Sequence, residues 1–195
     1  MSTIKLIVGL GNPGPQYQDT RHNAGAWFVE QVASESGITL KAESKFHGHA
    51  GKAIIANRSV QLLVPSTFMN RSGNAVQAIC QFYKIAPDEV LVAHDELDFE
   101  AGITKLKIAG GHGGHNGLRD IIQKFGGNKD FARLRVGIGH PGDKSQVHNY
   151  VLKSPSNTDK IKIQQSLDNA LRYLDLMVSG DMAKAMNALH TQETK

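Results

Sequence analysis

Residues 4–15 read IKLIVGLGNPGP, a short apolar run followed at once by a turn rich in glycine and proline. An apolar run of this length with such a turn behind it is typical of a buried strand. Residues 24–36, AGAWFVEQVASES, carry apolar side chains at helical spacing and stop at Gly37. A strand followed by a helix is the unit from which α/β proteins are built, and the remaining chain continues in the same way.

The rest of the chain alternates between the two kinds of element. Further strands are expected within 38–64, 90–93, 103–108 and 132–139, and further helices at 74–84, 116–125 and 159–178. In the first of these stretches, Asn57-Arg58-Ser59 is expected to form a hairpin turn, which makes the sheet mixed and not purely parallel. The sequence therefore predicts one α/β domain spanning residues 1–195, with a mixed twisted sheet and helices on both faces.

Composition favours a cytoplasmic protein. The chain has 195 residues and a single cysteine, Cys80, so no internal disulfide framework is possible and a reducing compartment is expected. Its first five residues lead straight into a strand, which predicts that no cleavable signal peptide is present. No stretch approaches the roughly 18 apolar residues of a membrane span.

Positive charge is concentrated in one segment. The net charge is only +4, yet residues 103–153 hold nine Lys or Arg against three acids. A basic segment on an otherwise balanced chain suits a polyanionic partner, although a solvated basic surface would look the same.

The glycines of residues 9–14, GLGNPG, match the spacing of a dinucleotide-binding turn. In that turn the helix begins inside the motif, so that its amides meet a pyrophosphate. Here Pro13 and Pro15 remove two amides, and the next helical pattern begins only at Ala24. A nicotinamide or flavin cofactor is therefore not expected, and the glycines are interpreted as shaping a turn that presents Asn12.

Polar residues follow several predicted strands. They are Asn12 with residues 20–23, Asn70, His94-Asp95, and the glycine-rich loop 110–116. Because open α/β sheets place their sites at the carboxyl ends of strands, these groups are expected to gather along one edge. There is no Gly-x-Ser-x-Gly motif, and Cys80 lies in a helical pattern, so a covalent nucleophile is not favoured.

A histidine paired with a carboxylate remains as the means of activating water. An imidazole titrates near neutral pH, and a carboxylate on its far nitrogen fixes the tautomer. Asparagine amides can hold a carbonyl oxygen without adding charge. These residues alone predict a hydrolytic α/β enzyme, and the basic segment suggests a polyanionic substrate as one interpretation.

Each candidate has an ordinary structural explanation too. Asn12 could be a turn residue, His22 a loop histidine that satisfies backbone groups, and Asp95 a loop cap. Asn70 and Asn116 precede helical patterns and could be N-caps. The basic residues of the strands, Lys107 and Arg135, could simply be solvated.

Two other classes of function stay open. A metal-dependent peptidase or amidohydrolase could use His112 and His115 with Asp95, although no His-Glu-x-x-His motif is present. A non-catalytic tRNA- or RNA-binding module would explain the basic segment, but aromatics make up only 6% of residues, few for a stacking surface.

Five blocks of sequence, in order, resemble those of bacterial peptidyl-tRNA hydrolases. They are residues 8–25, containing VGLGNPG and TRHNAG, residues 65–73, residues 94–98 (HDELD), residues 110–118 (GGHGGHNGL) and residues 133–141 (RLRVGIGHP). The resemblance covers residues 4 to about 153, whereas residues 36–60 and 155–195 carry no diagnostic pattern. It implies one α/β domain that acts as a cytoplasmic monomer, without a metal or cofactor and without DNA as a partner. The implied substrate is peptidyl-tRNA released prematurely from ribosomes.

The same resemblance implies roles for individual residues. His22 is the expected catalytic base, Asp95 keeps it in its basic form, and Asn12 helps to distinguish blocked from free aminoacyl ends. The positions expected to contact the acylated end of the substrate are Tyr17, Phe68, Asn70 and Asn116. Those expected to grip tRNA phosphate are Lys107 and Arg135.

Overall fold

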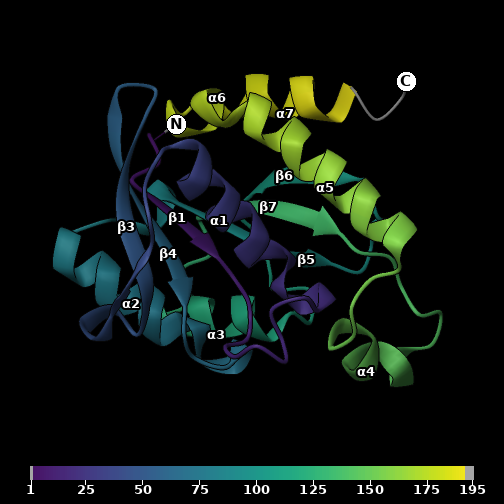
Figure 1. Ribbon diagram of the computed structural model, residues 1–195. Helices are drawn as coiled ribbons and strands as arrows, with labels where there is room; N and C mark the ends of the chain where they lie inside the picture. Colours follow the sequence, from purple (N-terminus) through teal and green to yellow (C-terminus); the bar gives the residue numbers. More distant parts are fainter. Residues whose placement is uncertain (1, 192–195) are drawn as a thin grey trace.

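A seven-stranded mixed sheet runs through the centre of the computed structural model, which describes residues 2–191 (Figure 1). The strand order is β2-β3-β4-β1-β5-β7-β6, and the four central strands β4, β1, β5 and β7 are mutually parallel. The outer pairings β2-β3, β3-β4 and β6-β7 are antiparallel. The strands are β1 (Leu6–Gly9), β2 (Lys41–Glu43), β3 (Gly48–Ile55), β4 (Arg58–Pro65), β5 (Val90–Glu96), β6 (Thr104–Ile108) and β7 (Ala132–Gly137). The mixed α/β sheet predicted from the sequence is confirmed.

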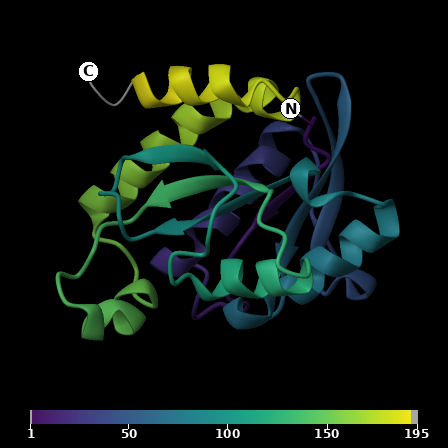
Figure 2. The same cartoon turned by 180° about the vertical axis from the view of Figure 1, so that it is seen from behind.

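Helices cover both faces of the sheet, as predicted (Figures 1 and 2). They are α1 (Ala24–Glu35), α2 (Ser72–Tyr83), α3 (Asn116–Lys124), α4 (Val147–Val151), α5 (Asn157–Arg172), α6 (Leu174–Val178) and α7 (Met182–Thr191). Side chains of β1 alternate between two cores: Leu6 and Val8 pack with α2 and α3, whereas Ile7 packs with α1 and α5–α7. No helix in the described part of the chain combines the length and apolar character needed to cross a bilayer.

Helix α1 contacts the sheet backbone directly. A Cβ at Gly25 would overlap the carbonyl oxygen of Ala93 on β5, and one at Gly9 would overlap the carbonyl oxygen of Gly25. Only glycine permits this approach. Since the 3₁₀ turn Arg21–Asn23 leads straight into α1, the contact brings His22 to the carboxyl end of β5.

The hairpin between β3 and β4 turns one residue earlier than expected. Ile55 pairs with Arg58, so the turn residues are Ala56 and Asn57, with φ of 52° and 60°. Two positive φ values define a type I′ turn, whose twist matches that of the flanking strands. The predicted turn at 57–59 was therefore displaced, although the hairpin itself is confirmed.

The single helix predicted over residues 159–178 is wrong. The chain leaves helical geometry at Tyr173, with φ −109° and ψ 11°, and this residue separates α5 from α6. The break turns Leu174, Met177 and Val178 into the core beside α7 and the sheet. Burial of these side chains outweighs the continuous helix that periodicity alone suggests.

Helix α7 covers the edge strand β6. The Leu106 amide, which has no neighbouring strand on that side, donates to Nε2 of His190 at 3.1 Å. Covering an edge in this way protects it from pairing with another chain.

Candidate active site

A cleft of about 1080 Å³ lies where the carboxyl ends of β1, β4 and β5 meet. Open α/β sheets bind their ligands at this edge. The structure brings all nine site residues predicted from the sequence to the wall of this one cleft. They are Asn12, Tyr17, His22, Phe68, Asn70, Asp95, Lys107, Asn116 and Arg135. Their placement is an observation, whereas their roles stay predictions.

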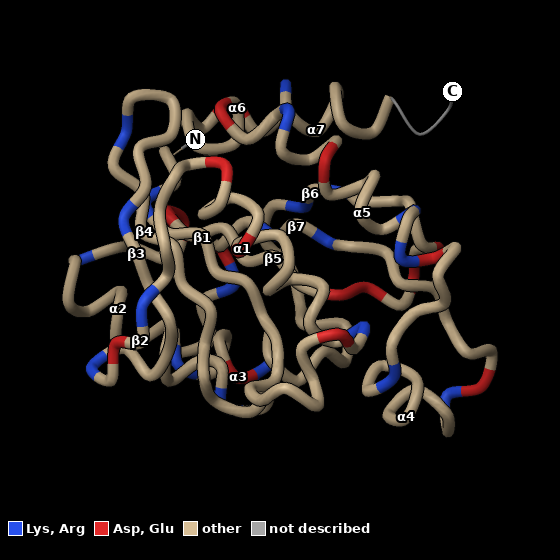
Figure 3. The backbone as a smooth tube through the Cα atoms, in the orientation of Figure 1, with Lys and Arg blue, Asp and Glu red and all other residues tan. Residues whose placement is uncertain are grey.

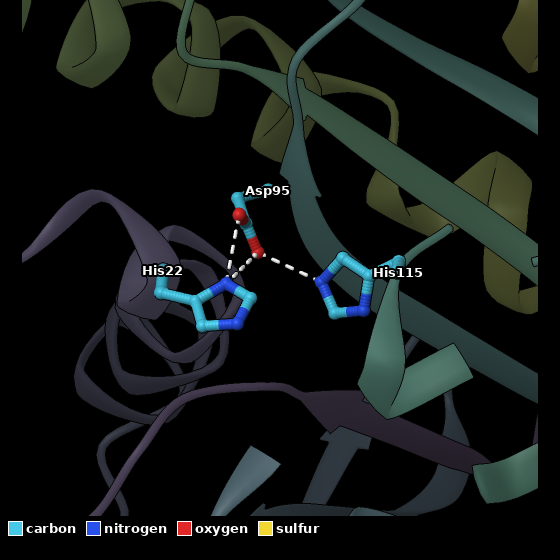
Figure 4. A group of neighbouring side chains, drawn as sticks. All are labelled: His22, Asp95 and His115. Carbon is cyan, nitrogen blue, oxygen red and sulfur yellow. Dashed lines mark hydrogen bonds and ion pairs between the residues drawn. The ribbon is translucent and has the colours of Figure 1, made fainter. Parts of the chain in front are cut away.

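His22 and Asp95 form the centre of the site (Figure 4). Nδ1 of His22 lies 3.0 and 2.9 Å from the two carboxylate oxygens of Asp95. The Asp95 side chain is only 2% exposed and that of His22 13%. Because Nδ1 faces the carboxylate, it carries a proton, and the neutral ring keeps the lone pair of Nε2 for another group.

Burial and charge act in opposite directions on this pair. Burial lowers the pKa of His22, but the charge of Asp95 and its hydrogen bonds more than offset this, so the pKa lies above its ordinary value. For Asp95, burial raises the pKa, yet the neighbouring imidazoles of His22 and His115 hold it well below the usual range. Asp95 is therefore ionised, and His22 is a stronger base than burial alone would leave it.

His115 is a second partner of Asp95 that the sequence did not reveal in this role. Its Nε2 lies 2.8 Å from Oδ1 of Asp95. Its Nδ1 accepts from the amides of Gly117 and Leu118 at 3.1 and 3.4 Å, which makes His115 the N-cap of α3. Since Nδ1 accepts, Nε2 must carry the proton and donate it to Asp95. His115 thus ties the carboxylate to the start of α3.

This tautomer bears on the metal-dependent alternative. Among the described residues, the proposed ligands His112, His115 and Asp95 do not form a compact group, and Nδ1 of His112 accepts from the amide of Gly114 at 2.9 Å. A different set, His22, Asp95 and His115, has ligand atoms within 4.8 Å of one another. In that set the two imidazole nitrogens turned toward Asp95 are at hydrogen-bond distance from its carboxylate, so a metal ion would have to displace their protons and replace these hydrogen bonds. The geometry thus favours hydrogen bonding over metal ligation.

A third histidine closes the buried side of the cluster. His94 donates from Nδ1 to the carbonyl oxygen of Asp95 at 2.8 Å, and its ring meets that of His115 edge-on at 5.0 Å. Burial is the main cause that lowers the pKa of His94 to about 3. His94 is therefore neutral at physiological pH and does not compete for the Asp95 carboxylate.

Asn12 connects two loops of the site. Its side-chain oxygen accepts from the amide of Met69 at 2.7 Å, and its own backbone forms two hydrogen bonds with the side chain of Asn23, at 2.9 and 3.0 Å. Asn12 is thus more than a turn residue. Asn23 and Met69 are buried supports of the site, and neither was singled out from the sequence as a site residue.

The two other asparagines are not helix caps. Arg71 and His115 occupy the N-cap positions of α2 and α3, so the capping explanation for Asn70 and Asn116 is wrong. Both side chains are exposed at the cleft, and Asn116 accepts from Arg119 at 3.2 Å. Tyr17 and Phe68 meet edge-on at 6.3 Å on the cleft wall, where Phe68 is 56% exposed.

Four basic side chains share one face of the β6–β7 pair. Blue segments mark Lys and Arg along these two strands in Figure 3. Lys105 pairs with Arg135 and Lys107 with Arg133, and paired residues of an antiparallel ladder point to the same side. This face accounts for much of the basic segment counted in the sequence. Arg135 is not simply solvated, because it is partly buried against Glu96. Its Nε and Nη2 lie 2.9 and 2.8 Å from Oε1 of Glu96.

Arg133 is a buried cation that sequence reasoning passed over. It is 1% exposed, and it donates to the carbonyl oxygens of Gly110, Gly111 and Lys129 at 2.6, 2.9 and 3.2 Å. Burial and the charge of Arg135 lower its pKa to about 10. Arg133 thereby fixes the glycine-rich loop that leads to His115, a contact with no local sequence signal.

Comparison with known proteins agrees with this geometry. A family model described as peptidyl-tRNA hydrolase matches residues 6–195. Peptidyl-tRNA hydrolases of Marinomonas sp. (strain MWYL1) and Pectobacterium atrosepticum are 56% and 57% identical, over 98% and 97% of both chains. The crystal structure of peptidyl-tRNA hydrolase from Acinetobacter baumannii is 51% identical, with a TM-score of 0.94, and covers 97% of this chain and 95% of its own. The chain belongs to the peptidyl-tRNA hydrolase family.

Proposed function

We propose that this protein hydrolyses the ester bond between a peptide and its tRNA, with His22 as the general base. The observation that carries the proposal is the buried Asp95 carboxylate on Nδ1 of His22, which leaves Nε2 as the basic nitrogen. The resemblance to bacterial peptidyl-tRNA hydrolases implies that the protein acts as a monomer. The expected compartment is the cytoplasm, where translation supplies peptidyl-tRNA.

The reaction needs a single acid–base group. Nε2 of His22 takes a proton from water as the water oxygen attacks the ester carbonyl carbon. Asp95 stabilises the imidazolium that forms. When the tetrahedral intermediate collapses, the bond to the ribose oxygen breaks, and the imidazolium returns its proton to that oxygen. The products are a free peptide acid and an intact tRNA.

Amide side chains at the cleft wall fit the remaining requirements. Asn70 and Asn116 are exposed there and can donate to the ester carbonyl and to the peptide. Their amide groups can stabilise the oxyanion of the tetrahedral intermediate without adding charge to the site. Lys107 and Arg135 lie along the same cleft, where they can contact phosphates of the bound tRNA.

The test is to incubate the purified protein with N-acetyl-aminoacyl-tRNA and, separately, with the unblocked aminoacyl-tRNA. Rapid release of the acyl group from the blocked substrate alone is expected. Binding without release would favour the RNA-binding module, and loss of release on treatment with a chelator would favour a metal-dependent enzyme.

Asn12→Asp should erode the preference for blocked substrates. The carboxylate can still accept from the Met69 amide, so the loop contact survives, whereas the amide donor of Asn12 is lost. The new negative charge would also attract a free α-ammonium group. The ratio of kcat/KM for N-acetyl- and unblocked aminoacyl-tRNA is therefore expected to fall. An equal loss on both substrates would leave Asn12 with a structural role only.

Lys107→Ala and Arg135→Ala should each raise KM for full-length tRNA substrates, with a smaller effect on kcat. Each lost phosphate contact is expected to reduce the salt dependence of binding by about one unit of log–log slope. The measurement is KM across a salt series, on full-length substrate and on a minimal acylated fragment without the contacted phosphates. Equal damage on the fragment would place these side chains in the catalytic centre and contradict the phosphate contact.

A further inference from the structure

Arg135 already has an anionic partner before any RNA is present. Glu96, the last residue of β5, offers Oε1 to Nε and Nη2 of Arg135 at 2.9 and 2.8 Å. Both side chains are partly buried, at 18% and 22% exposure, so solvent screens the pair less than it would at an open surface. The guanidinium carbon of Arg135 also lies 4.6 Å from the ring centroid of Phe99. The phosphate contact proposed above therefore involves a cation that is partly neutralised.

The contact engages only one side of the guanidinium. A guanidinium has two forks for anions, one formed by Nε and Nη2 and one by Nη1 and Nη2. Glu96 occupies the first fork, and the exposed carboxylate of Asp98 lies farther away, 4.0 Å from Nη2. The second fork can therefore still accept a phosphate, through Nη1 above all. The other oxygen of Glu96, Oε2, accepts from the backbone amide of Asp98 at 3.4 Å, which helps to hold the carboxylate in place. A phosphate can therefore bind Arg135 while Glu96 remains, and the two anions then repel each other.

We propose that Glu96 is a specificity-determining residue, a resident anion on Arg135 that makes the site too weak for any phosphate that does not also reach Lys107. Lys107 and Arg135 are diagonal neighbours across the β6–β7 ladder, and such neighbours lie about 7–8 Å apart. A phosphate placed correctly by the tRNA meets both cations, and their combined attraction outweighs the repulsion from Glu96. A phosphate of an unrelated RNA that meets Arg135 alone gains little.

This inference rests on the proposed phosphate contact of Arg135 and specifies how that contact selects RNA. It predicts that removing the charge of Glu96 strengthens binding, and strengthens the wrong ligands most. A supporting role, in which Glu96 only orients Arg135, predicts the opposite sign. The two roles are therefore separable by one substitution.

Glu96→Gln is the variant to test, because the amide oxygen can still accept from Nε of Arg135 while the charge is lost. The probes are a short RNA hairpin of unrelated sequence, used as an inhibitor, and N-acetyl-aminoacyl-tRNA, used as the substrate. The inhibition constant of the hairpin is expected to fall about two- to fivefold, the range given by partly exposed ion pairs. KM of the substrate should fall less, and both gains should shrink at high salt.

Two comparisons make the test specific. Glu100→Gln removes one exposed acid from the loop after β5, so it measures the effect of net charge alone. In an Arg135→Ala background, Glu96→Gln should have no further effect, because Glu96 acts through that guanidinium. A gain that persists there, or that Glu100→Gln reproduces in the wild type, would overturn the proposal.

The remaining outcomes are equally decisive. A higher inhibition constant for the hairpin with Glu96→Gln would make Glu96 a support for Arg135 and overturn the inference, and an unchanged constant would overturn it as well. If Arg135→Ala leaves KM of the full substrate unchanged, the phosphate contact itself fails and the inference fails with it. A rise in KM with Arg135→Ala but no effect of Glu96→Gln would refute only the role of Glu96.

Discussion

His22→Ala is expected to abolish hydrolysis, with a loss in kcat of about 10²–10⁴-fold. The reason is that Nε2 of His22 is the basic nitrogen left available by the buried Asp95 carboxylate. His94 is neutral but buried, and both ring nitrogens of His115 are engaged. Neither can take over as the base. Binding of tRNA should stay within a few-fold of the wild type, since the proposed phosphate contacts, Lys107 and Arg135, lie on β6 and β7.

The measurement is single-turnover release from N-acetyl-aminoacyl-tRNA, with tRNA affinity determined in parallel. A matched control is His49→Ala, which removes an exposed histidine of β3 that lies outside the cleft. If the His22 variant kept most of its rate, another group would have to supply the base, and the assignment would be wrong.

Asp95→Asn should also cause a large loss at neutral pH, smaller than that of His22→Ala. An asparagine offers one acceptor and one donor where the carboxylate accepts from both His22 and His115. An amide nitrogen turned toward His22 would favour the tautomer that carries its proton on Nε2, which is the nitrogen that must accept. Loss of the carboxylate also removes the stabilisation of the imidazolium in the transition state.

The pH dependence of kcat/KM separates this role from a structural one. The base works when His22 is neutral, so activity rises with pH through its pKa. In the wild type, Asp95 raises this pKa above the ordinary value. Without the carboxylate, burial alone acts and lowers it, so the acidic limb of the profile should move to lower pH while the plateau drops. A variant with an unchanged limb and plateau would show that Asp95 does not act on His22.

The sequence was sufficient for most of the architecture because hydrophobic patterning and turn residues are local signals. The apolar run of β1, the apolar spacing of α1 and the helical pattern of residues 74–84 in α2 were all readable in this way. Two errors arose where tertiary packing decided the outcome. The break at Tyr173 depends on burial of α6, and the shift of the β3–β4 turn depends on pairing between the strands.

For the site, the sequence identified residue types at strand ends, and the family resemblance implied the pair of His22 and Asp95, which the structure brings into contact. The other contacts of the site could not be predicted. Asn116 looked like a cap because it precedes a helical pattern, yet His115 performs that function through Nδ1. His115 itself looked like a metal ligand, because its spacing to His112 is one that metal ligands often have. Pairs such as Glu96 with Arg135 join strands whose adjacency is set only by folding, so no local pattern announces them.

The distance between His22 and Asp95 depends on how closely helix α1 packs against strand β5. The backbone of α1 packs directly against that of β5 at Gly25, and this contact sets the distance between His22 and Asp95. The methyl group of an alanine at position 25 would push α1 away from β5. We expect this to lengthen the distance between His22 and Asp95, although neither residue is itself changed. A design that grafts His22 and Asp95 onto another scaffold would therefore also need a glycine at the position of Gly25 to keep their spacing.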